Sequence, residues 1–247
     1  MTTFKEYLLE GIEDRGIFKS VFFAGTPGAG KTYVSKALSS GSISPRIVNT
    51  DIAFEFLSKH AGISIGQSFE QEKESFQNFF LDKAKQITKE QLAQYINGML
   101  PLFIDSTSSN IEALVARNGI LESFGYDTAM VWINTDIETA LKRAATRDRH
   151  VNEQFIRSVY ALADANKKYY KAKFHTFLEV DNNDGELTDS AIQAAYRRMS
   201  SFFTSGVENP IGARTIQRMK GSGMKTLDPG IHSMNYIKSH LDHWYVN

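Results

Sequence analysis

The sequence contains no cysteine, only five prolines and no net charge, because 28 basic residues balance 28 acidic ones. Without cysteine the chain has no disulfide, no thiolate zinc site and no cysteine nucleophile, and it is compatible with a reducing compartment. The charge balance and the ordinary apolar content do not indicate a disordered chain or a protein that coats a polyanion. No apolar run approaches the roughly 20 residues that cross a bilayer.

The first residues, "MTTFKEYLLEGIEDRG", are charged throughout and have no apolar core of signal-peptide length. We therefore expect a soluble intracellular protein that works in the cytoplasm and does not contact a membrane. A chain of 247 residues is long enough for one large domain, or for a domain with an appendage.

Short apolar runs alternate with helix-length segments along most of the chain. Strands are expected over residues 18–24, 46–51, 100–105, 128–134 and 174–182. Helices are expected over residues 32–38, 52–60, 66–99, 110–126, 135–149, 152–173 and 188–203, with Thr135 and Asn152 as candidate N-caps. This order predicts an α/β fold with a five-stranded parallel sheet, helices on both faces, and ligands at the carboxyl ends of the strands.

Gly, Asn and Pro cluster between residues 204 and 212, and this predicts a boundary between a main domain, 1–204, and an extension, 205–247. Residues 190–247 carry seven Lys or Arg against three acids, and they hold three of the six histidines. A basic, aromatic extension is typical of a nucleic-acid contact. The alternative is a helical cap whose aromatic side chains pack on the main domain. For the pair His240 and His243, such packing is favoured over metal binding.

The octet "GTPGAGKT", residues 25–32, lies between the first expected strand and a helix and fits the P-loop pattern G-x-x-x-x-G-K-[ST]. In this motif the backbone N–H groups surround phosphate oxygens at a helix N-terminus. Lys31 reaches the β and γ phosphates, and the Thr32 hydroxyl coordinates Mg²⁺. Asp51 follows at the spacing of a ribose-binding acid, but the glycines do not fit the dinucleotide pattern G-x-G-x-x-G.

The residues around the third strand favour phosphoryl transfer over hydrolysis or switching. Asp105 ends that strand, where a second oxygen ligand for Mg²⁺ is expected, and Ser106 stands where motor ATPases commonly have a water-activating glutamate. The base-reading motif of a regulatory GTPase is not found. Transfer to a hydroxyl instead needs a bound nucleotide, a base at the acceptor and cations over the transferring group.

Asp51, after the second strand in "NTD", is the candidate general base for the acceptor hydroxyl. Its alternative role is to cap the helix that follows. Arg143 and Arg147 lie four apart on an expected helix, with Arg149 just beyond, and the guanidinium fork suits phosphate oxygens. The alternative is a surface helix with ordinary charges.

Taken together, these residues resemble the P-loop kinase group that includes zeta toxins and the kinase domain of polynucleotide kinases. The resemblance covers residues 18–183. It rests on "GTPGAGKT", "NTD", "LFIDSTSSN", "GYDTAMVWI", "RAATRDRHVNEQFI" and "LEVDNND" in that order. The C-terminal segment has the look of extensions on kinases of tailed bacteriophages, some of which phosphorylate hydroxymethylated pyrimidines in DNA; for such a protein the compartment is the host cytoplasm.

The resemblance implies a kinase that uses ATP and Mg²⁺. It implies ATP binding by Gly28, Ala29, Gly30, Lys31, Thr32, Tyr33, Arg143 and Asn183, with Asn182 beside the last of these. It implies that Asp51 is the general base and that the catalytic cations are Lys31, Arg147 and Arg149. It also implies that Thr32 and Asp105 are metal ligands and that Thr107 lies near the metal or the acceptor.

Two departures from the group leave the acceptor open. No arginine follows Asp51 within a few residues, and Asn152 stands where polynucleotide kinases tend to have proline. The acceptors implied are a nucleic acid or nucleotide, such as hydroxymethyluracil in DNA or a 5′-hydroxyl end. The alternatives are a nucleotide sugar, or no acceptor at all in a nucleotide-dependent binding or assembly protein. The oligomeric state is not indicated.

Overall fold

The computed structural model describes residues 15–39, 44–61, 71–106, 108–146, 152–183, 189–223 and 232–245. Its centre is a five-stranded sheet in the order β2-β3-β1-β4-β5, in which every pair is parallel. The strands are β1 (Lys19–Ala24), β2 (Arg46–Val48), β3 (Leu102–Asp105), β4 (Asp127–Asn134) and β5 (Thr176–Asp181). The α/β P-loop fold predicted from the sequence is confirmed.

Strand β1 lies in the middle of the sheet because both of its faces are apolar. Phe22 and Ala24 point into one buried cluster, while Val21 and Phe23 point into another. This alternation follows from the two-residue period of a strand, and a parallel strand that is buried on both faces reads as a continuous apolar run.

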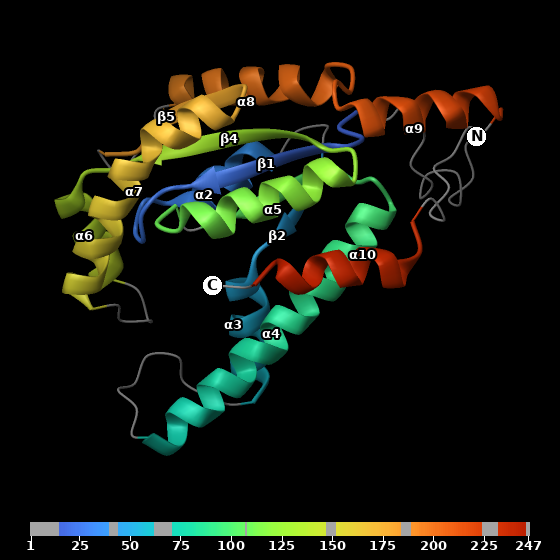
Figure 1. The fold of residues 1–247 in the computed structure, drawn as a ribbon. Coiled ribbons are helices and arrows are strands. Elements are labelled where there is room, and N and C mark those ends of the chain that lie inside the picture. Colours follow the sequence, from blue (N-terminus) through green and yellow to red (C-terminus); the bar gives the residue numbers. More distant parts are fainter. Residues whose placement is uncertain are drawn as a thin grey trace, which may run out of the picture.

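Helices cover both faces of the sheet (Figure 1). Helices α2 (Lys31–Ser39) and α8 (Asp189–Thr204) bury one face. Helices α5 (Ile111–Ser123) and α7 (Glu153–Lys173) bury the other. Helices α3 (Thr50–His60) and α4 (Gln71–Asn97) pack on each other beside β2. The remaining helices are α6 (Ile137–Ala145), α9 (Pro210–Gly221), α10 (Met234–His240) and the 3-10 turn η1 (Leu241–His243).

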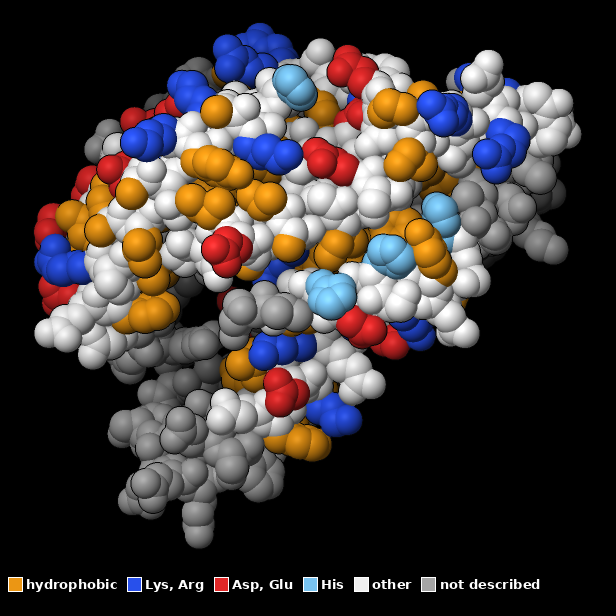
Figure 2. All heavy atoms as spheres, viewed as in Figure 1, with side chains coloured by type: hydrophobic (Ala, Val, Ile, Leu, Met, Phe, Trp, Pro, Cys, Tyr) orange, Lys and Arg blue, Asp and Glu red, His pale blue; other side chains and the backbone are white. Residues whose placement is uncertain are grey.

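The segment after α8 joins the core of the main sheet. Met219, Ile237, Leu241 and Trp244 belong to the same buried cluster as Phe22. Histidine side chains gather with apolar ones over α10 (Figure 2), where the rings of His232 and His240 pack against Phe124 in α5. Aromatic packing therefore accounts for these two histidines, and in the described ranges no group of three or more His, Asp or Glu side chains is arranged to hold a metal ion.

A buried ion pair attaches the segment between α8 and α9 to the start of the sheet. Lys19 Nζ, almost fully buried, lies 2.7 Å from Asp127 Oδ2, and it also donates to the backbone oxygen of Gly206 at 2.9 Å. The Asp127 carboxylate accepts the backbone N–H groups of Glu208 and Asn209. Two charges buried together are stable only when such hydrogen bonds satisfy both.

Several boundaries differ by a few residues from the sequence-based expectation, and three of these lie close to the site. The second strand was expected over residues 46–51, but β2 ends at Val48 because the Asn49 side chain caps α3. Thr135 was expected to cap the next helix, but its hydroxyl donates to the backbone oxygen of Ala29 and Asp136 is the cap of α6. That helix was expected to reach residue 149 and ends at Ala145.

Other expectations fall partly outside the described residues. The long helix expected from residue 66 is α4, which is described from Gln71, so residues 62–70 lie outside. The Asn152 cap of α7 is confirmed, since its side-chain oxygen accepts the N–H of Gln154. Within the described ranges, no helix is long and apolar enough to span a membrane.

Candidate active site

The loop between β1 and α2 is closely packed against two other segments at the carboxyl edge of the sheet. Gly28 and Gly30 both have a φ of 86°, a left-handed conformation that favours glycine. A Cβ on Gly28 would lie 2.3 Å from the backbone oxygen of Ala140, and a Cβ on Gly30 would lie 2.4 Å from Asn182 Nδ2. The two glycines are therefore required by space as well as by conformation.

Asn182 holds the loop between β1 and α2 by a side-chain hydrogen bond. Its buried side-chain amide donates to the backbone oxygen of Ala29 at 2.7 Å, and the Thr135 hydroxyl donates to the same oxygen at 3.3 Å. Asn183, next in the chain, accepts the backbone N–H of Asp136 through its side-chain oxygen at 2.6 Å. Strands β4 and β5 thus hold the shape of the loop through the residues that follow them.

Lys31 lies at the first position of α2 and folds over the loop. Its Nζ donates to the backbone oxygens of Gly25 at 3.0 Å and Thr26 at 3.1 Å. The first backbone N–H groups of a helix have no partner within the helix, and they carry the positive end of the helix dipole. The ammonium group of Lys31 and the N-terminus of α2 therefore lie close together, an arrangement that favours anion binding.

Two buried polar atoms, one beside the loop and one within it, have no hydrogen-bond partner in the part of the chain that the structure describes. They are Arg143 Nη1 and Thr26 Oγ1. Arg143 Nη1 lies 3.9 Å from the point that a Cβ on Gly30 would occupy, so the guanidinium group flanks the loop. An unsatisfied buried donor costs about 1–3 kcal/mol, and phosphate oxygens are the acceptors that arginine suits best. The loop and its surroundings fit a nucleotide phosphate.

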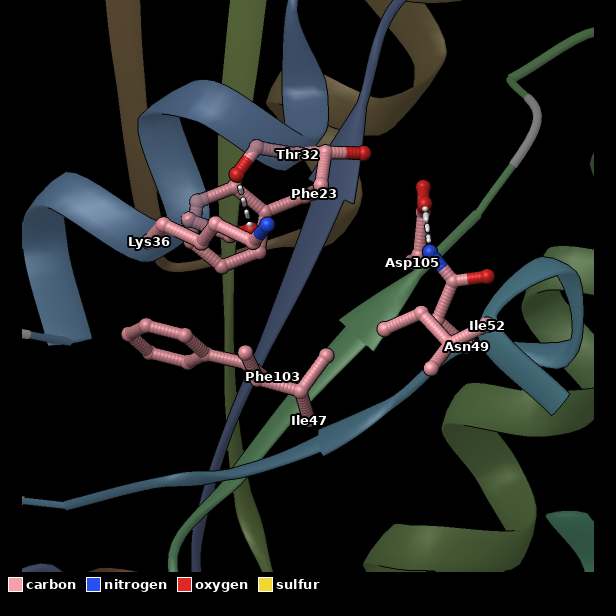
Figure 3. Close-up of a pocket in the computed structure, with 9 residues that line it drawn as sticks. Phe23, Thr32, Lys36, Ile47, Asn49, Ile52, Phe103 and Asp105 are labelled. Atoms are coloured by element: carbon pink, nitrogen blue, oxygen red, sulfur yellow. Dashed lines mark hydrogen bonds between the residues drawn. The ribbon is translucent and has the colours of Figure 1, made fainter. Parts of the chain in front are cut away.

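A pocket opens beside α2, between the ends of β1, β2 and β3 (Figure 3). Thr32 and Lys36 of α2 line one side, and Asn49, Ile52 and Asp105 line the other. Aromatic and aliphatic side chains from the strands form the floor, namely Phe23, Ile47 and Phe103. The pocket therefore has an apolar base beneath two polar walls.

Thr32 and Asp105 face each other across this pocket (Figure 3). A hydroxyl and a carboxylate are the hard oxygen ligands that Mg²⁺ prefers, and this ion usually takes one or two carboxylates together with substrate phosphates. Asp105 Oδ2 also accepts a hydrogen bond from Asn49 Nδ2 at 2.7 Å, which orients the carboxylate. The residues present therefore fit a magnesium ion shared with a bound nucleotide.

Asp51 lies at the second position of α3, on the exposed side of that helix. Its backbone N–H donates to Asn49 Oδ1 at 2.8 Å, so the N-cap role considered for Asp51 belongs to Asn49. Asp51 does not line the pocket itself, but Asn49 and Ile52 on either side of it do. The backbone of Asp51 is therefore beside the pocket wall opposite α2, and its side chain is exposed.

The structure brings most of the expected site residues to one edge of the sheet. The phosphate loop, Arg143, Thr32 and Asp105 lie together, Asp51 is exposed between Asn49 and Ile52 of the opposite pocket wall, and Tyr33 is exposed on α2. Arg147, Arg149 and Thr107 lie outside the described residues. Asn49 and Lys36 were not predicted from the sequence; the signal for Asn49 was its residue type, since asparagine is a preferred N-cap and the expected helix begins three residues later.

A family model described as an AAA domain (AAA_33) matches residues 21–171, and no curated protein matches the chain in sequence. Among solved structures, a putative kinase from Chloroflexus aurantiacus J-10-fl has a TM-score of 0.52 at 14% identity, over 75% of this chain and 98% of that one. A chain of the Pnkp1/Rnl/Hen1 RNA repair complex has a TM-score of 0.48 at 15% identity, over 65% of this chain and 47% of that one. Deoxyadenosine kinase from M. mycoides with bound dATP has a TM-score of 0.45 at 14% identity, over 74% of this chain and 100% of that one.

Proposed function

The chain belongs to the AAA_33 family of AAA domains, and from that premise we propose that it is an ATP-dependent kinase that transfers the γ-phosphoryl group to an alcohol. The observation that carries the proposal is the arrangement at the carboxyl edge of the sheet. The start of α2, which follows the phosphate loop and carries Lys31 and Thr32, lies on one side of a pocket, and Asn49 and Ile52, which flank Asp51 in the sequence, line the other.

The nucleotide is held by the loop and the start of α2. Backbone N–H groups at Gly28, Ala29 and Gly30 and at the first turn of α2 bind the phosphates. Lys31 exchanges its bonds to the backbone oxygens of Gly25 and Thr26 for bonds to the β and γ phosphates. Arg143 Nη1, buried beside the loop, donates to a phosphate oxygen, while Tyr33 and Asn183 are proposed to contact the nucleotide at its edges.

Thr32 and Asp105 are the proposed ligands of Mg²⁺, with the Asn49 amide holding Asp105 in place. A magnesium ion held by these two residues would supply positive charge to the bound nucleotide. Every other part of the proposed reaction is carried by side chains and backbone groups of the chain.

Asp51 is the proposed general base. Its carboxylate takes the proton of the acceptor hydroxyl as that oxygen attacks the γ-phosphorus. The bond between the γ-phosphorus and the β–γ bridging oxygen breaks, and ADP leaves with the electron pair of that bond. Lys31, Arg147 and Arg149 are proposed to offset the negative charge on the transferring group, the two arginines by their resemblance to catalytic cations of the P-loop kinase group.

We propose a nucleic acid or nucleotide as the acceptor, with a hydroxymethyluracil in DNA or a 5′-hydroxyl end as the specific candidates. The resemblance to polynucleotide kinases and to phage kinases supports this choice. The excess of four positive charges in residues 190–247, from seven Lys or Arg and three acids, favours a polyanion. A cytoplasmic location is proposed with it.

The test is transfer from γ-³²P-labelled ATP with Mg²⁺ to a panel of acceptors. The panel contains 5′-hydroxyl oligonucleotides, hydroxymethyluracil DNA and amino-sugar nucleotides. Label on one of the first two supports the proposal, and label on the third reassigns the acceptor to a nucleotide sugar. Label released only as phosphate would contradict the kinase and support a binding or assembly protein that uses ATP slowly.

Three variants assign the roles. Asp51→Asn should lower transfer by about 10²–10⁴-fold with ATP binding retained, whereas Lys31→Ala should lose both. Asp164→Asn is the matched control, because Asp164 is an exposed aspartate on α7. Full transfer by Asp51→Asn would remove Asp51 from the mechanism.

A further inference from the structure

The side chain of Tyr245 reaches the helix that carries Asp51. Its hydroxyl lies 3.0 Å from Thr50 Oγ1, and the two residues are 195 positions apart in the sequence. Thr50 is the first residue of α3 and directly precedes Asp51. Figure 1 shows the C-terminal end of the chain beside α3. A segment far from the phosphate loop in sequence therefore contacts the proposed base through one neighbouring residue.

Tyr245 is fixed in place by α5. Arg117 Nε donates to the backbone oxygen of Trp244 at 2.8 Å, and the guanidinium carbon lies 5.8 Å from the Trp244 ring and 5.9 Å from the Tyr245 ring. Burial lowers the pKa of Arg117 and raises the pKa of Tyr245. A cation near two rings that are partly withdrawn from water attracts both, so Arg117 helps to hold the Tyr245 ring against α5.

The same segment is attached to α4. Lys238 of α10 forms an ion pair of 2.6 Å with Glu90, and Asp242 forms another with Lys89. The hydroxyl of Thr88 in α4 is near enough to that of Tyr245 to lower its pKa, as the Thr50 hydroxyl does, and both partly offset the rise from burial. The Tyr245 hydroxyl therefore lies between α3 and α4, on a ring that α5 holds.

The attachment matters because α3 is otherwise connected to the sheet by a short strand. Strand β2 is three residues long and lies at the edge, where it pairs with β3 alone. Between β2 and Asp51 there are only Asn49, which bonds to Asp105, and Thr50, which bonds to Tyr245. These two side-chain contacts act on the first turn of α3, in addition to the packing of the helix on α4.

We propose that Tyr245 is a positioning residue for Asp51, and that the C-terminal segment thereby forms part of the acceptor side of the site. This rests on the proposed function. Tyr245 acts through Thr50: its hydroxyl holds the first turn of α3 at the pocket rim, so that the Asp51 carboxylate stays directed at the acceptor.

The first measurement is hydrogen–deuterium exchange of peptides from α3, which needs no acceptor. Tyr245→Phe and Thr50→Val each remove one side of the contact, and Thr50→Ser keeps the hydroxyl. Tyr236→Phe is the matched control, because Tyr236 is an exposed tyrosine of α10 that packs on Phe124. Tyr245→Phe and Thr50→Val should speed exchange of the first turn of α3 by about fivefold, the equivalent of one hydrogen bond.

The double variant should exchange no faster than either single one, because both remove the same contact. Thr50→Ser and Tyr236→Phe should exchange as the unaltered chain does. Unchanged exchange in Tyr245→Phe, or effects that multiply in the double variant, would overturn the proposal.

The second measurement is transfer to the acceptor that the panel identifies. Tyr245→Phe and Thr50→Val should each lower kcat about fivefold or more with ATP affinity unchanged. Thr50→Ser, which keeps the hydroxyl, should retain the kcat of the unaltered chain, a distinction that a loss of general stability would not make. An unchanged kcat overturns the proposal. Full transfer by Asp51→Asn would instead overturn the proposed function. That transfer assay does not depend on the exchange measurement, so the two failures can be told apart.

Discussion

The side-chain amide of Asn49 donates a hydrogen bond to Asp105 over 2.7 Å. The oxygen of the same amide accepts the backbone N–H that begins α3. One side chain therefore connects the end of β3 to the helix that carries the proposed base. A magnesium ligand and a general base would be held in register by a residue that itself lines the pocket.

Replacing Asn49 by alanine should affect both stability and magnesium dependence. Loss of the cap should lower the free energy of unfolding by about 1 kcal/mol, and a less oriented Asp105 should raise several-fold the Mg²⁺ concentration needed for ATP binding. Asn110→Ala is the control, since Asn110 caps α5 in the same way. Equal magnesium dependence in the two variants would contradict the role of Asn49.

Replacing Gly30 by alanine should weaken ATP binding at least tenfold. The new Cβ would meet Asn182 at 2.4 Å, and the residue has a φ of 86°, so the loop must shift at a cost of about 1–3 kcal/mol. Gly119→Ala makes the same change in the exposed interior of α5 with nothing within 4 Å, and should stabilise the chain by about 0.5–1 kcal/mol. Calorimetric titration and thermal unfolding measure the two effects.

Replacing Asp127 by alanine should destabilise the chain by about 3 kcal/mol, because the buried ammonium of Lys19 then has no counter-charge. Asp82→Ala breaks an exposed ion pair with Lys85 and should change stability by less than about 1 kcal/mol. Urea unfolding compares the two. Similar losses of stability in the two variants would show that the buried Lys19–Asp127 pair contributes no more than an exposed one.

Glu179 should make stability depend on pH at the acidic end. Hydrogen bonds from Lys167 and then Lys171 lower the pKa of Glu179 from 4.5 to about 2. Because the pKa is lower in the folded chain, this contribution is fully present above pH 4.5 and is lost as the pH falls from 4.5 towards 2. The side chain is 33% exposed, so screening limits the contribution to about 1 kcal/mol.

Glu179→Gln tests this dependence by urea unfolding at pH 7, 5 and 3. The variant should be less stable than the unaltered chain at pH 7 and pH 5, and the difference should shrink at pH 3. A difference that persists undiminished at pH 3 would show that the effect is not ionic.

The sheet and the phosphate loop could be predicted from the sequence because both depend on local patterns. Apolar runs identify parallel strands buried on both faces, and the spacing of Gly28, Gly30 and Lys31 is a property of one short segment. The start of α6 could not be predicted, because Thr135 and Asp136 can both cap a helix. The choice is made by Ala29, more than 100 residues away, whose backbone oxygen engages the Thr135 hydroxyl.

The acceptor side was less predictable for the same reason. Asp51 was found from its place after a strand, but its cap, Asn49, also bonds to Asp105, a contact between strands that no local pattern reveals. The aromatic character of the C-terminal segment predicted packing on the main domain. It did not indicate that Tyr245 would meet Thr50, since contacts at such separation depend on how the whole fold closes.

The segment after α8 is attached at both ends of the strands. The Lys19–Asp127 pair holds it where β1 and β4 begin, and Tyr245 holds it beyond the end of β2. Detaching it would open the apolar cluster that it shares with the sheet, so we expect it to unfold together with the sheet, in a single cooperative transition. The two tryptophans report this directly, because Trp132 lies in β4 and Trp244 in the C-terminal segment, and their fluorescence should change at one denaturant concentration.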